Sequence, residues 1–305
     1  MVLFTHFLRG LRWRVILQEL KHGVSVVDTW GGIMVGYLLN NFVPRLGEFG
    51  RAYTTSRIEK TSMSGVLGTI VLERLFDFVS TGILVGAALF SYNGNLTESF
   101  PFLRVAGLLL IIGSFAVGAV LYAASVSRKF KEMILRIIKF ILPKKSAEKI
   151  ETIVISFLTS FRILKSGKRL GIIVFYTALI WFVLIYSTYL PFFAFGFGAK
   201  LHLTLYDAFL LLIIITMAWI VPSPGATGVY HLFVSQALMT IASVPKDEAL
   251  AYATLTHLLG YIGITIVGAV FALIFAQRLR VKSVGKLFSR RETFGKGEAE
   301  QNQVE

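Results

Sequence analysis

Val43-Pro44-Arg45-Leu46-Gly47-Glu48-Phe49-Gly50 closes an apolar stretch of the chain and follows the pattern Val-Pro-x-x-Gly-x-x-Gly. The same pattern returns 178 positions later, as Val221-Pro222-Ser223-Pro224-Gly225-Ala226-Thr227-Gly228. The chain contains only 7 prolines and 27 glycines in 305 residues, so chance explains two copies poorly. A proline and glycine break inside a hydrophobic segment, repeated in both halves of a chain, is typical of the binding site of a transporter.

The composition predicts a membrane protein. The chain is 55% apolar and only 16% charged, with a mean hydropathy of +0.71. Four stretches are long enough to cross an apolar layer of about 30 Å as helices, whereas a soluble domain would alternate polar and apolar positions. They are 66–90, 103–125, 170–198 and 249–277. We therefore predict an all-α, polytopic membrane protein whose two broken segments form helical hairpins, either re-entrant or complete.

The basic residues are distributed unevenly along a chain whose formal net charge is +14. Residues 128–169 and the stretch after 278 are rich in Lys and Arg, whereas the connection 91–102 contains neither. Because basic loops stay inside, we expect 128–169 and the C-terminus to be cytoplasmic, 91–102 to be external, and the protein to lie in the cell membrane. The charge flanks the spans, so anionic lipid headgroups are a better expected partner than nucleic acid.

These sides give the two hairpins opposite orientations, the first entering from the cytoplasm and the second from outside, as an inverted-topology repeat requires. If the two breaks are halves of one site, we expect them to meet near mid-membrane. We therefore divide a single transmembrane domain, 1–277, into parts. They are a cytoplasmic or interfacial arm (1–22), a first repeat (24–125), a basic amphipathic cytoplasmic linker (126–169) and a second repeat (170–277), with a basic and then disordered tail (278–305) after them. The counterpart of span 170–198 would lie mostly before Met1, so we expect the architecture's first helix to precede this sequence.

The linker carries two amphipathic patterns. An apolar residue recurs every three or four positions from Ile150 to Leu164, which indicates one face of a helix, and a second apolar run extends from Ile134 to Ile141. Such helices either lie in the membrane interface or cover the cytoplasmic ends of the bundle, and the sequence leaves both alternatives open.

The two breaks carry candidate ligand-binding groups. Where a helix is interrupted, the next half-helix presents unpaired backbone N–H groups and a positive dipole end, which attract anions. Glycines let a ligand approach such a backbone closely, and arginines beside it can bind phosphate in two-pronged fashion. The candidates are Arg45, Gly47, Gly50, Arg51, Pro224, Gly225 and Gly228. The alternative is that these glycines and prolines only shape helix packing.

Charged residues inside the span 66–90 form a second group of candidates. Glu73 and Asp77 share one helix face, and Arg74 reaches Asp77 at a spacing of three. Ionisable groups at such depth are costly and mark pathways or internal pairs. The alternative to a functional cluster is an ion pair that locks this helix to Arg45 or Arg51. His231, after the second break, and His257 are weaker candidates that interhelical hydrogen bonds would also explain.

Several of these residues lie in segments that resemble a known family of membrane proteins. The segments Asn40-Asn41-Phe42-Val43-Pro44-Arg45-Leu46-Gly47-Glu48-Phe49-Gly50-Arg51-Ala52, Val71-Leu72-Glu73-Arg74-Leu75-Phe76-Asp77 and Pro224-Gly225-Ala226-Thr227-Gly228 resemble the flippase-like membrane family typified by the transmembrane region of lysylphosphatidylglycerol synthases. Arg12–Arg14 resembles the end of an early helix of that family. The family often has an acidic residue three positions after the last glycine, where this chain has His231. We expect no counterpart of the soluble aminoacyl-transferase domain of the full synthases.

The resemblance and the breaks together lead us to expect a protein that binds an anionic phospholipid or lipid-linked precursor and moves it between leaflets, without cofactor or metal. The glycines would cradle the headgroup, Arg45 and Arg51 would hold phosphate, and Glu48, Glu73 and Asp77 would orient them or accept a cationic group. Asn41, Arg74 and His231 complete the expected site. The alternatives are a membrane-embedded transferase on lipid-linked sugars and a non-transporting partner of an envelope-biogenesis enzyme. The chain has no P-loop, HExxH or GxSxG motif, so we expect no catalytic residue.

Overall fold

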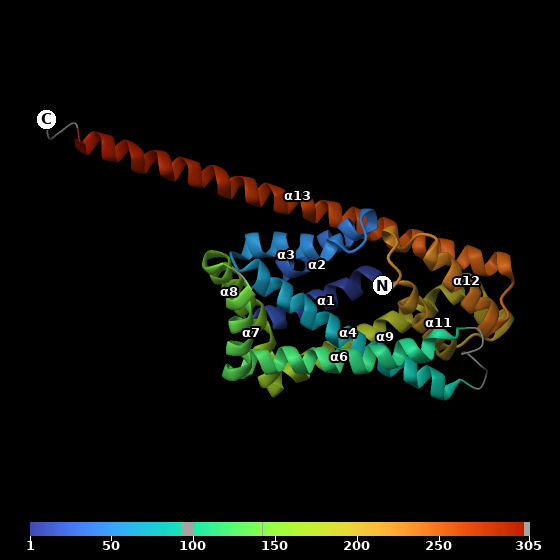
Figure 1. Cartoon of the computed structure of the whole chain (residues 1–305). Coiled ribbons are helices and arrows are strands. Elements are labelled where there is room, and N and C mark those ends of the chain that lie inside the picture. Colours follow the sequence, from blue (N-terminus) through green and yellow to red (C-terminus); the bar gives the residue numbers. More distant parts are fainter. Residues whose placement is uncertain (93–99, 142, 302–305) are drawn as a thin grey trace.

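The structure, a computed structural model, describes residues 1–92, 100–141 and 143–301. Within these ranges it is helical and contains no strand, which confirms the predicted all-α class (Figure 1). The longer helices are α1 Val2–Leu17, α2 Val26–Phe42, α3 Leu46–Glu59, α4 Met63–Ser91, α6 Phe102–Val126, α7 Arg128–Ile141, α8 Lys144–Thr159, α9 Gly167–Ala194, α11 Leu205–Ala218, α12 Val229–Ala242 and α13 Lys246–Gln301. Short elements are η1 Ser160–Lys165, α10 Phe197–Leu201 and η2 Pro224–Ala226.

Three of the described helices are long and apolar enough to cross a membrane, namely α6, α9 and the part of α13 from Lys246 to Arg280. α4, with 29 residues, is about as long but carries the three charged residues that the sequence singles out. Large apolar side chains such as Leu109 and Phe115 of α6 are exposed, as expected where helices face lipid rather than water. The chain is therefore an all-α polytopic membrane protein.

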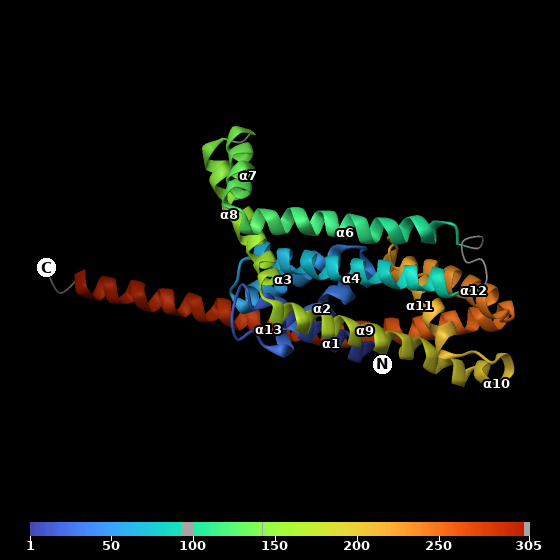
Figure 2. The ribbon, with the colours of Figure 1, turned by 90° about the horizontal axis from the view of Figure 1, so that it is seen from below.

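Both broken segments form hairpins whose arms are short. α2 has 17 residues and α3, α11 and α12 have 14 each, so the arms are about 21–26 Å long at 1.5 Å per residue. This is less than the about 30 Å of a bilayer core, so the hairpins have re-entrant length. The α2–α3 hairpin enters from the bundle end where α7 and α8 lie, and the α11–α12 hairpin enters from the opposite end (Figures 1 and 2).

The packing pattern follows the predicted inverted repeat. If α1, α2, α3 and α4 are matched with α9, α11, α12 and α13, most neighbours in one half are neighbours in the other, with the α1–α4 contact as an exception. α1 packs on α2 as α9 packs on α11, and α3 packs on α4 as α12 packs on α13. The halves also cross over in the same way, because α2 packs on α13 and α11 packs on α4.

The prediction that 1–22 is a cytoplasmic or interfacial arm is wrong for most of its length. α1 packs against α2, α4 and α9, and its Arg12 and Trp13 are fully buried. The arginines of this helix suggested an exposed arm, but acidic side chains of α4 compensate Arg9 and Arg12 inside the bundle. The first repeat therefore begins with α1, before residue 24.

In the linker α8 follows one of the two open alternatives, whereas the tail differs from expectation. α8 packs mainly on α4, with Leu158 buried, so this helix covers the bundle, whereas α7 makes its main contacts with α6 and α8 alone. The tail expected to be disordered continues α13 as a helix to Gln301, since no proline interrupts the sequence after Pro245. Most of the connection expected to be external, 93–99, and the last residues, 302–305, lie outside the described residues.

Candidate functional site

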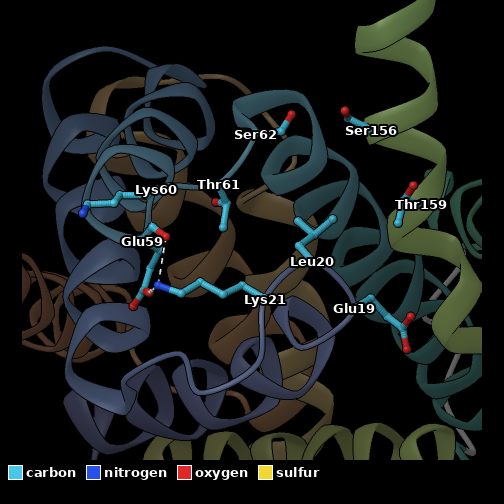
Figure 3. A pocket seen from close by; sticks show the side chains of 9 residues that line it. All are labelled: Glu19, Leu20, Lys21, Glu59, Lys60, Thr61, Ser62, Ser156 and Thr159. Atoms are coloured by element: carbon cyan, nitrogen blue, oxygen red, sulfur yellow. Dashed lines mark hydrogen bonds and ion pairs between the residues drawn. The ribbon is translucent and has the colours of Figure 1, made fainter.

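A hollow of about 420 Å³ opens at the bundle end where α1, α3 and α8 finish and α4 begins (Figure 3). It is lined by Glu19, Leu20, Lys21, Glu59, Lys60, Thr61, Ser62, Ser156 and Thr159. Nζ of Lys21 lies 2.5 Å from Oε2 of Glu59, so these two charges compensate each other. The residues predicted from the two breaks do not line this hollow, which lies at the end of α3 far from Arg45.

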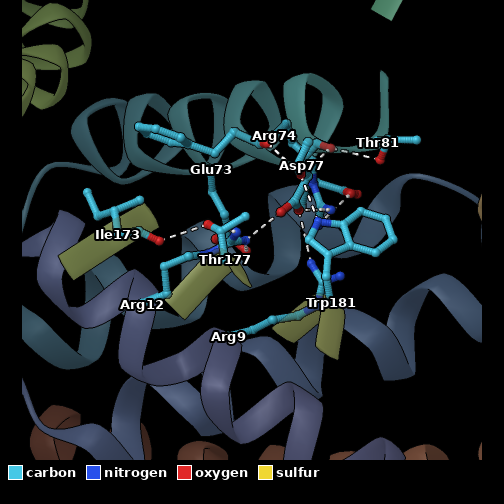
Figure 4. A network of polar contacts seen from close by, with 12 residues as sticks. Arg9, Arg12, Glu73, Arg74, Asp77, Thr81, Ile173, Thr177 and Trp181 are labelled. Carbon is cyan, nitrogen blue, oxygen red and sulfur yellow. Dashed lines mark hydrogen bonds and ion pairs between the residues drawn. The ribbon is translucent and has the colours of Figure 1, made fainter. Parts of the chain in front are cut away.

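The charged residues of α4 meet two arginines of α1 inside the bundle (Figure 4). Arg12 Nη2 lies 2.7 Å from Asp77 Oδ1 and 3.3 Å from Glu73 Oε1, and Arg12 Nη1 donates to Thr177 Oγ1 of α9 at 3.0 Å. Arg9 Nη1 donates to the other Asp77 oxygen at 2.9 Å. Glu73 and Asp77 therefore share one face of α4, as their spacing predicts, and the guanidinium groups of α1 bind to this face. Together with the bond from Arg12 to Thr177, these contacts join α1, α4 and α9.

The network continues along α4 to the first hairpin. Arg74 Nη1 lies 3.3 Å from Asp77 Oδ2, as its spacing predicts, and Arg74 Nη2 lies 3.7 Å from Glu48 Oε1 in the first turn of α3. The Arg74 and Glu48 side chains are each about one-third exposed. This partly open pair connects the buried network with the tip of the α2–α3 hairpin.

Arg51 forms a buried ion pair. Its Nη2 binds Glu73 Oε2, and its guanidinium lies 3.6 Å from the ring centroid of Trp13, a cation–π contact. Trp13 is held in turn by a hydrogen bond from its Nε1 to Thr69 Oγ1 at 2.9 Å. Arg51 was expected to hold phosphate, but its geometry is that of the alternative, an internal lock between α3 and α4.

The network contains more positive than negative groups. In the part of the chain that the structure describes, Arg9, Arg12, Arg51 and Arg74 face three carboxylates, those of Glu48, Glu73 and Asp77. Within the described residues, the Nε atom of each of these four arginines is buried without a hydrogen-bond partner. Buried charge is stable only when it is paired, so this arrangement favours an additional anionic group nearby.

The two glycines of the first break serve close packing. The Gly47 amide donates to Asn40 Oδ1 at 2.7 Å, and a Cβ at Gly47 would lie 2.0 Å from the backbone oxygen of Gly36. A Cβ at Gly50 would lie 2.0 Å from Leu39 Cδ1. The predicted backbone cradle is therefore wrong at this break, because its space and the Gly47 amide are already used between α2 and α3.

The second break is more open. Gly225 is buried, with φ of +53°, and a Cβ there would lie 2.6 Å from the Tyr261 ring. Gly228 has φ of +81°, is exposed, and would place a Cβ in open space. Pro224 is also exposed, and Gly228 immediately precedes α12. Of the four glycines, Gly228 alone combines a positive φ with free space at the start of a half-helix.

The two breaks meet, as the inverted repeat predicts. Exposed Arg45, at the tip of the first hairpin, donates from Nη2 to the backbone oxygen of Ile220 at 3.1 Å. Buried Asn41 donates from Nδ2 to Thr265 Oγ1 of α13 at 2.9 Å, and its Oδ1 lies 3.4 Å from the position of a Cβ at Gly225. Arg45 takes no ion pair in the described residues, so the predicted lock uses Arg51 and not Arg45.

The second half contains aromatic rings where the first half contains charges. A shift of 178 positions places Ala251 and Leu255 where the first half has Glu73 and Asp77. His231 packs on His257 with ring centroids 5.0 Å apart, and Tyr230 and Tyr261 lie 5.1 and 5.9 Å from His257. His231 is thus near the second break but apart from the arginine network, and the site is asymmetric.

The sequence prediction missed Arg9 and Arg12, the main partners of Asp77. Their spacing of three places both on one face of their helix, as the i, i+4 spacing places the two acids on one face of α4. This complementary pattern was the available signal, but only packing of α1 against α4 shows that the two patterns face each other.

The chain matches a family model described as the lysylphosphatidylglycerol synthase transmembrane region over residues 1–268. It is similar to a UPF0104 membrane protein of Pyrococcus horikoshii, at 25% identity over 87% of this chain and 82% of that protein. A UPF0104 membrane protein of Methanocaldococcus jannaschii is 22% identical over 89% and 81% of the two chains. The glycosyltransferase AglD of Haloferax volcanii is 22% identical over 86% of this chain but 46% of that protein. No solved structure gives a significant match.

Proposed function

The chain belongs to the lysylphosphatidylglycerol synthase transmembrane region family, and on that premise we propose that it binds the headgroup of an anionic phospholipid or lipid-linked precursor and moves it between leaflets. The observation that carries this proposal is the meeting of the two breaks, through Arg45 Nη2 and the oxygen of Ile220 at 3.1 Å. Re-entrant hairpins that enter from opposite ends and meet inside give a ligand site that each side can reach in turn.

Arg45 is the phosphate-binding group in this proposal. It is exposed, and the contact that the structure gives it is a single hydrogen bond to a neutral carbonyl. Phosphate offers a guanidinium two charged acceptors and binds it more strongly than a carbonyl does. The exposed backbone at Gly228, which opens the N-terminal end of α12, supplies a second anion-attracting group.

The same contact suggests how the headgroup moves. A phosphate that binds Arg45 replaces the oxygen of Ile220 as its hydrogen-bond acceptor. The hydrogen bond that holds the tips of the two hairpins together is then broken. Glu73 and Arg51 keep α3 fixed to α4 during this step, because their ion pair is buried away from the tips. The positive excess of the neighbouring arginine network favours an anionic ligand. Movement is then downhill or ion-coupled.

The expected sides of the membrane belong to this proposal. The end with α7, α8 and the basic part of α13 is cytoplasmic, and the protein lies in the cell membrane. The ligand is held without cofactor or metal and leaves unchanged, so the protein is a transporter and not an enzyme.

A second candidate is a membrane-embedded transferase on lipid-linked sugars. His231 favours it, because its imidazole lies three residues after Gly228 and is a base at the second break. The similarity to a protein named glycosyltransferase covers less than half of that protein, so it adds little weight. Conversion of a lipid-linked sugar that is lost in His231→Gln would decide for this candidate.

Transport is tested with the purified chain in vesicles that contain fluorescent phosphatidylglycerol. The membrane-impermeant reductant dithionite bleaches the outer leaflet, so lipid that moves outward is bleached in turn. We expect Arg45→Gln to slow this movement about tenfold or more, since it removes the phosphate partner. Arg57→Gln is the matched control, because Arg57 is an exposed arginine of α3, the helix that Arg45 precedes, and lies far from the break.

Equal rates for the two variants and the unchanged protein would remove Arg45 from the mechanism. Movement no faster than in protein-free vesicles, with phosphatidylglycerol and with lipid-linked precursor alike, would overturn transport itself. The chain would then be a partner of another membrane enzyme.

A further inference from the structure

α7 exposes an apolar stripe beside basic side chains. Phe140 is 92% exposed, Ile137 51% and Met133 47%, although large apolar groups normally avoid water. Lys129 and Arg136 are also exposed and lie next to this stripe on the helix. The opposite side of α7 packs on α6 and α8, where Leu135 is buried. One face of α7 is thus covered by protein, and the neighbouring face is not.

The orientation of α7 matches that of a membrane surface. α6, a candidate span, ends at Val126, and α7 begins two residues later at Arg128. In both views the α7–α8 hairpin runs across the direction of α6 at one end of the bundle, and Figure 2 shows it projecting from the side of the bundle (Figures 1 and 2). Because α6 crosses the bilayer, a helix that runs across it at its end lies in the plane of the headgroups.

The exposed face of α7 carries cationic and apolar side chains, which suit the headgroup and the acyl chains of a lipid. Residues 128–141 contain five Lys or Arg and one acidic residue, Glu132, which pairs with Arg128. A hollow of about 510 Å³ on this face is lined by Lys129, Glu132, Met133, Arg136 and Ile137. Apolar and cationic groups that line the same hollow fit acyl chain and phosphate, respectively.

We propose that α7 is an interfacial anchor that inserts Met133, Ile137 and Phe140 into the bilayer that the protein spans, with Lys129 and Arg136 on the phosphates of anionic lipids. The occupant of the stripe is lipid rather than another protein, since the face is strongly cationic and lies where the chain leaves the membrane. α7 thereby senses the anionic lipid content of one leaflet, independently of whether lipid moves through the bundle.

The chain has no cysteine, so single labels can be placed cleanly. A bimane fluorophore is attached to Ile137→Cys, and to Lys139→Cys as the matched control. Both side chains are about half exposed and lie on the same helix, but Lys139 is on the polar face. The whole protein is reconstituted in phosphatidylcholine vesicles with 30% phosphatidylglycerol and lipids that carry a nitroxide quencher just below the headgroup.

We expect the label at residue 137 to be quenched at least twofold more than the label at 139. The difference should shrink in pure phosphatidylcholine, or when Lys129→Gln and Arg136→Gln are combined, because the cationic contacts are then lost. Equal quenching at both positions would overturn the anchor. Quenching at 137 that is unaffected by phosphatidylglycerol would overturn the anionic preference, and protection that rises with protein density instead of with quencher would identify a second copy as the occupant.

Discussion

Arg12 Nη2 lies 2.7 Å from Asp77 Oδ1, although 65 residues separate them in the chain. The Arg12 side chain has no exposed surface, and Glu73, its other acidic partner, is 1% exposed. The helix that sequence patterns place at the membrane edge is therefore held in the interior by charges. Removal of one member leaves its partners charged and buried, which is more costly than never having formed the pair.

We accordingly expect Glu73→Gln to lower the free energy of unfolding by about 3–5 kcal/mol, the usual loss when a buried pair is broken from one side. Thermal unfolding in detergent, followed by circular dichroism, measures the effect. Glu148→Gln is the control, because Glu148 is exposed on α8 and its carboxylate makes no ion pair with any of the described side chains. Similar melting temperatures for the two variants would contradict a structural role for the network.

Gly47→Ala tests whether the first break is a packed joint or an open cradle. The added methyl group would lie 2.0 Å from the Gly36 oxygen, so α2 and α3 must separate. We expect a loss of about 1–3 kcal/mol in stability, as for other overpacked sites. Gly113→Ala, in the interior of α6 where a Cβ meets open space, should instead stabilise by about 0.5–1 kcal/mol. If the Gly47→Ala protein were as stable as the unchanged protein but no longer bound lipid, the first break would be a binding site for the headgroup after all.

Cysteine labelling from one side of the membrane tests the topology. Ser146 is exposed on α8, and Asp247 is exposed at the start of α13, at the opposite end of the bundle (Figure 1). In intact cells we expect an impermeant maleimide to label Asp247→Cys and spare Ser146→Cys, with both labelled after lysis. The reverse pattern would invert the orientation, and labelling of both in intact cells would contradict a bundle that spans the membrane.

The sequence by itself determined the class, the two breaks and three of the four predicted spans, all but 66–90, whose helix α4 is charged. Hydropathy acts over one helix length, and proline and glycine act on the backbone where they stand, so these features need no knowledge of neighbours. The repeated Val-Pro-x-x-Gly-x-x-Gly pattern also predicted opposite hairpins that meet, and the contact of Arg45 with Ile220 confirms it. Glu73, Arg74 and Asp77 were recognised as a cluster for the same local reason, their spacing on one helix.

Only the tertiary structure decided which groups these residues meet. Arg12 and Asp77 find each other because α1 packs on α4, and nothing in the spacing of either helix chooses that neighbour over Arg45. Packing also decided that the Gly47 amide donates its hydrogen bond to Asn40. It decided as well that α8 covers the bundle while α7 projects from it. A buried ion pair or a filled break depends on atoms from segments far apart in the chain, and their contacts exist only once the helices have packed.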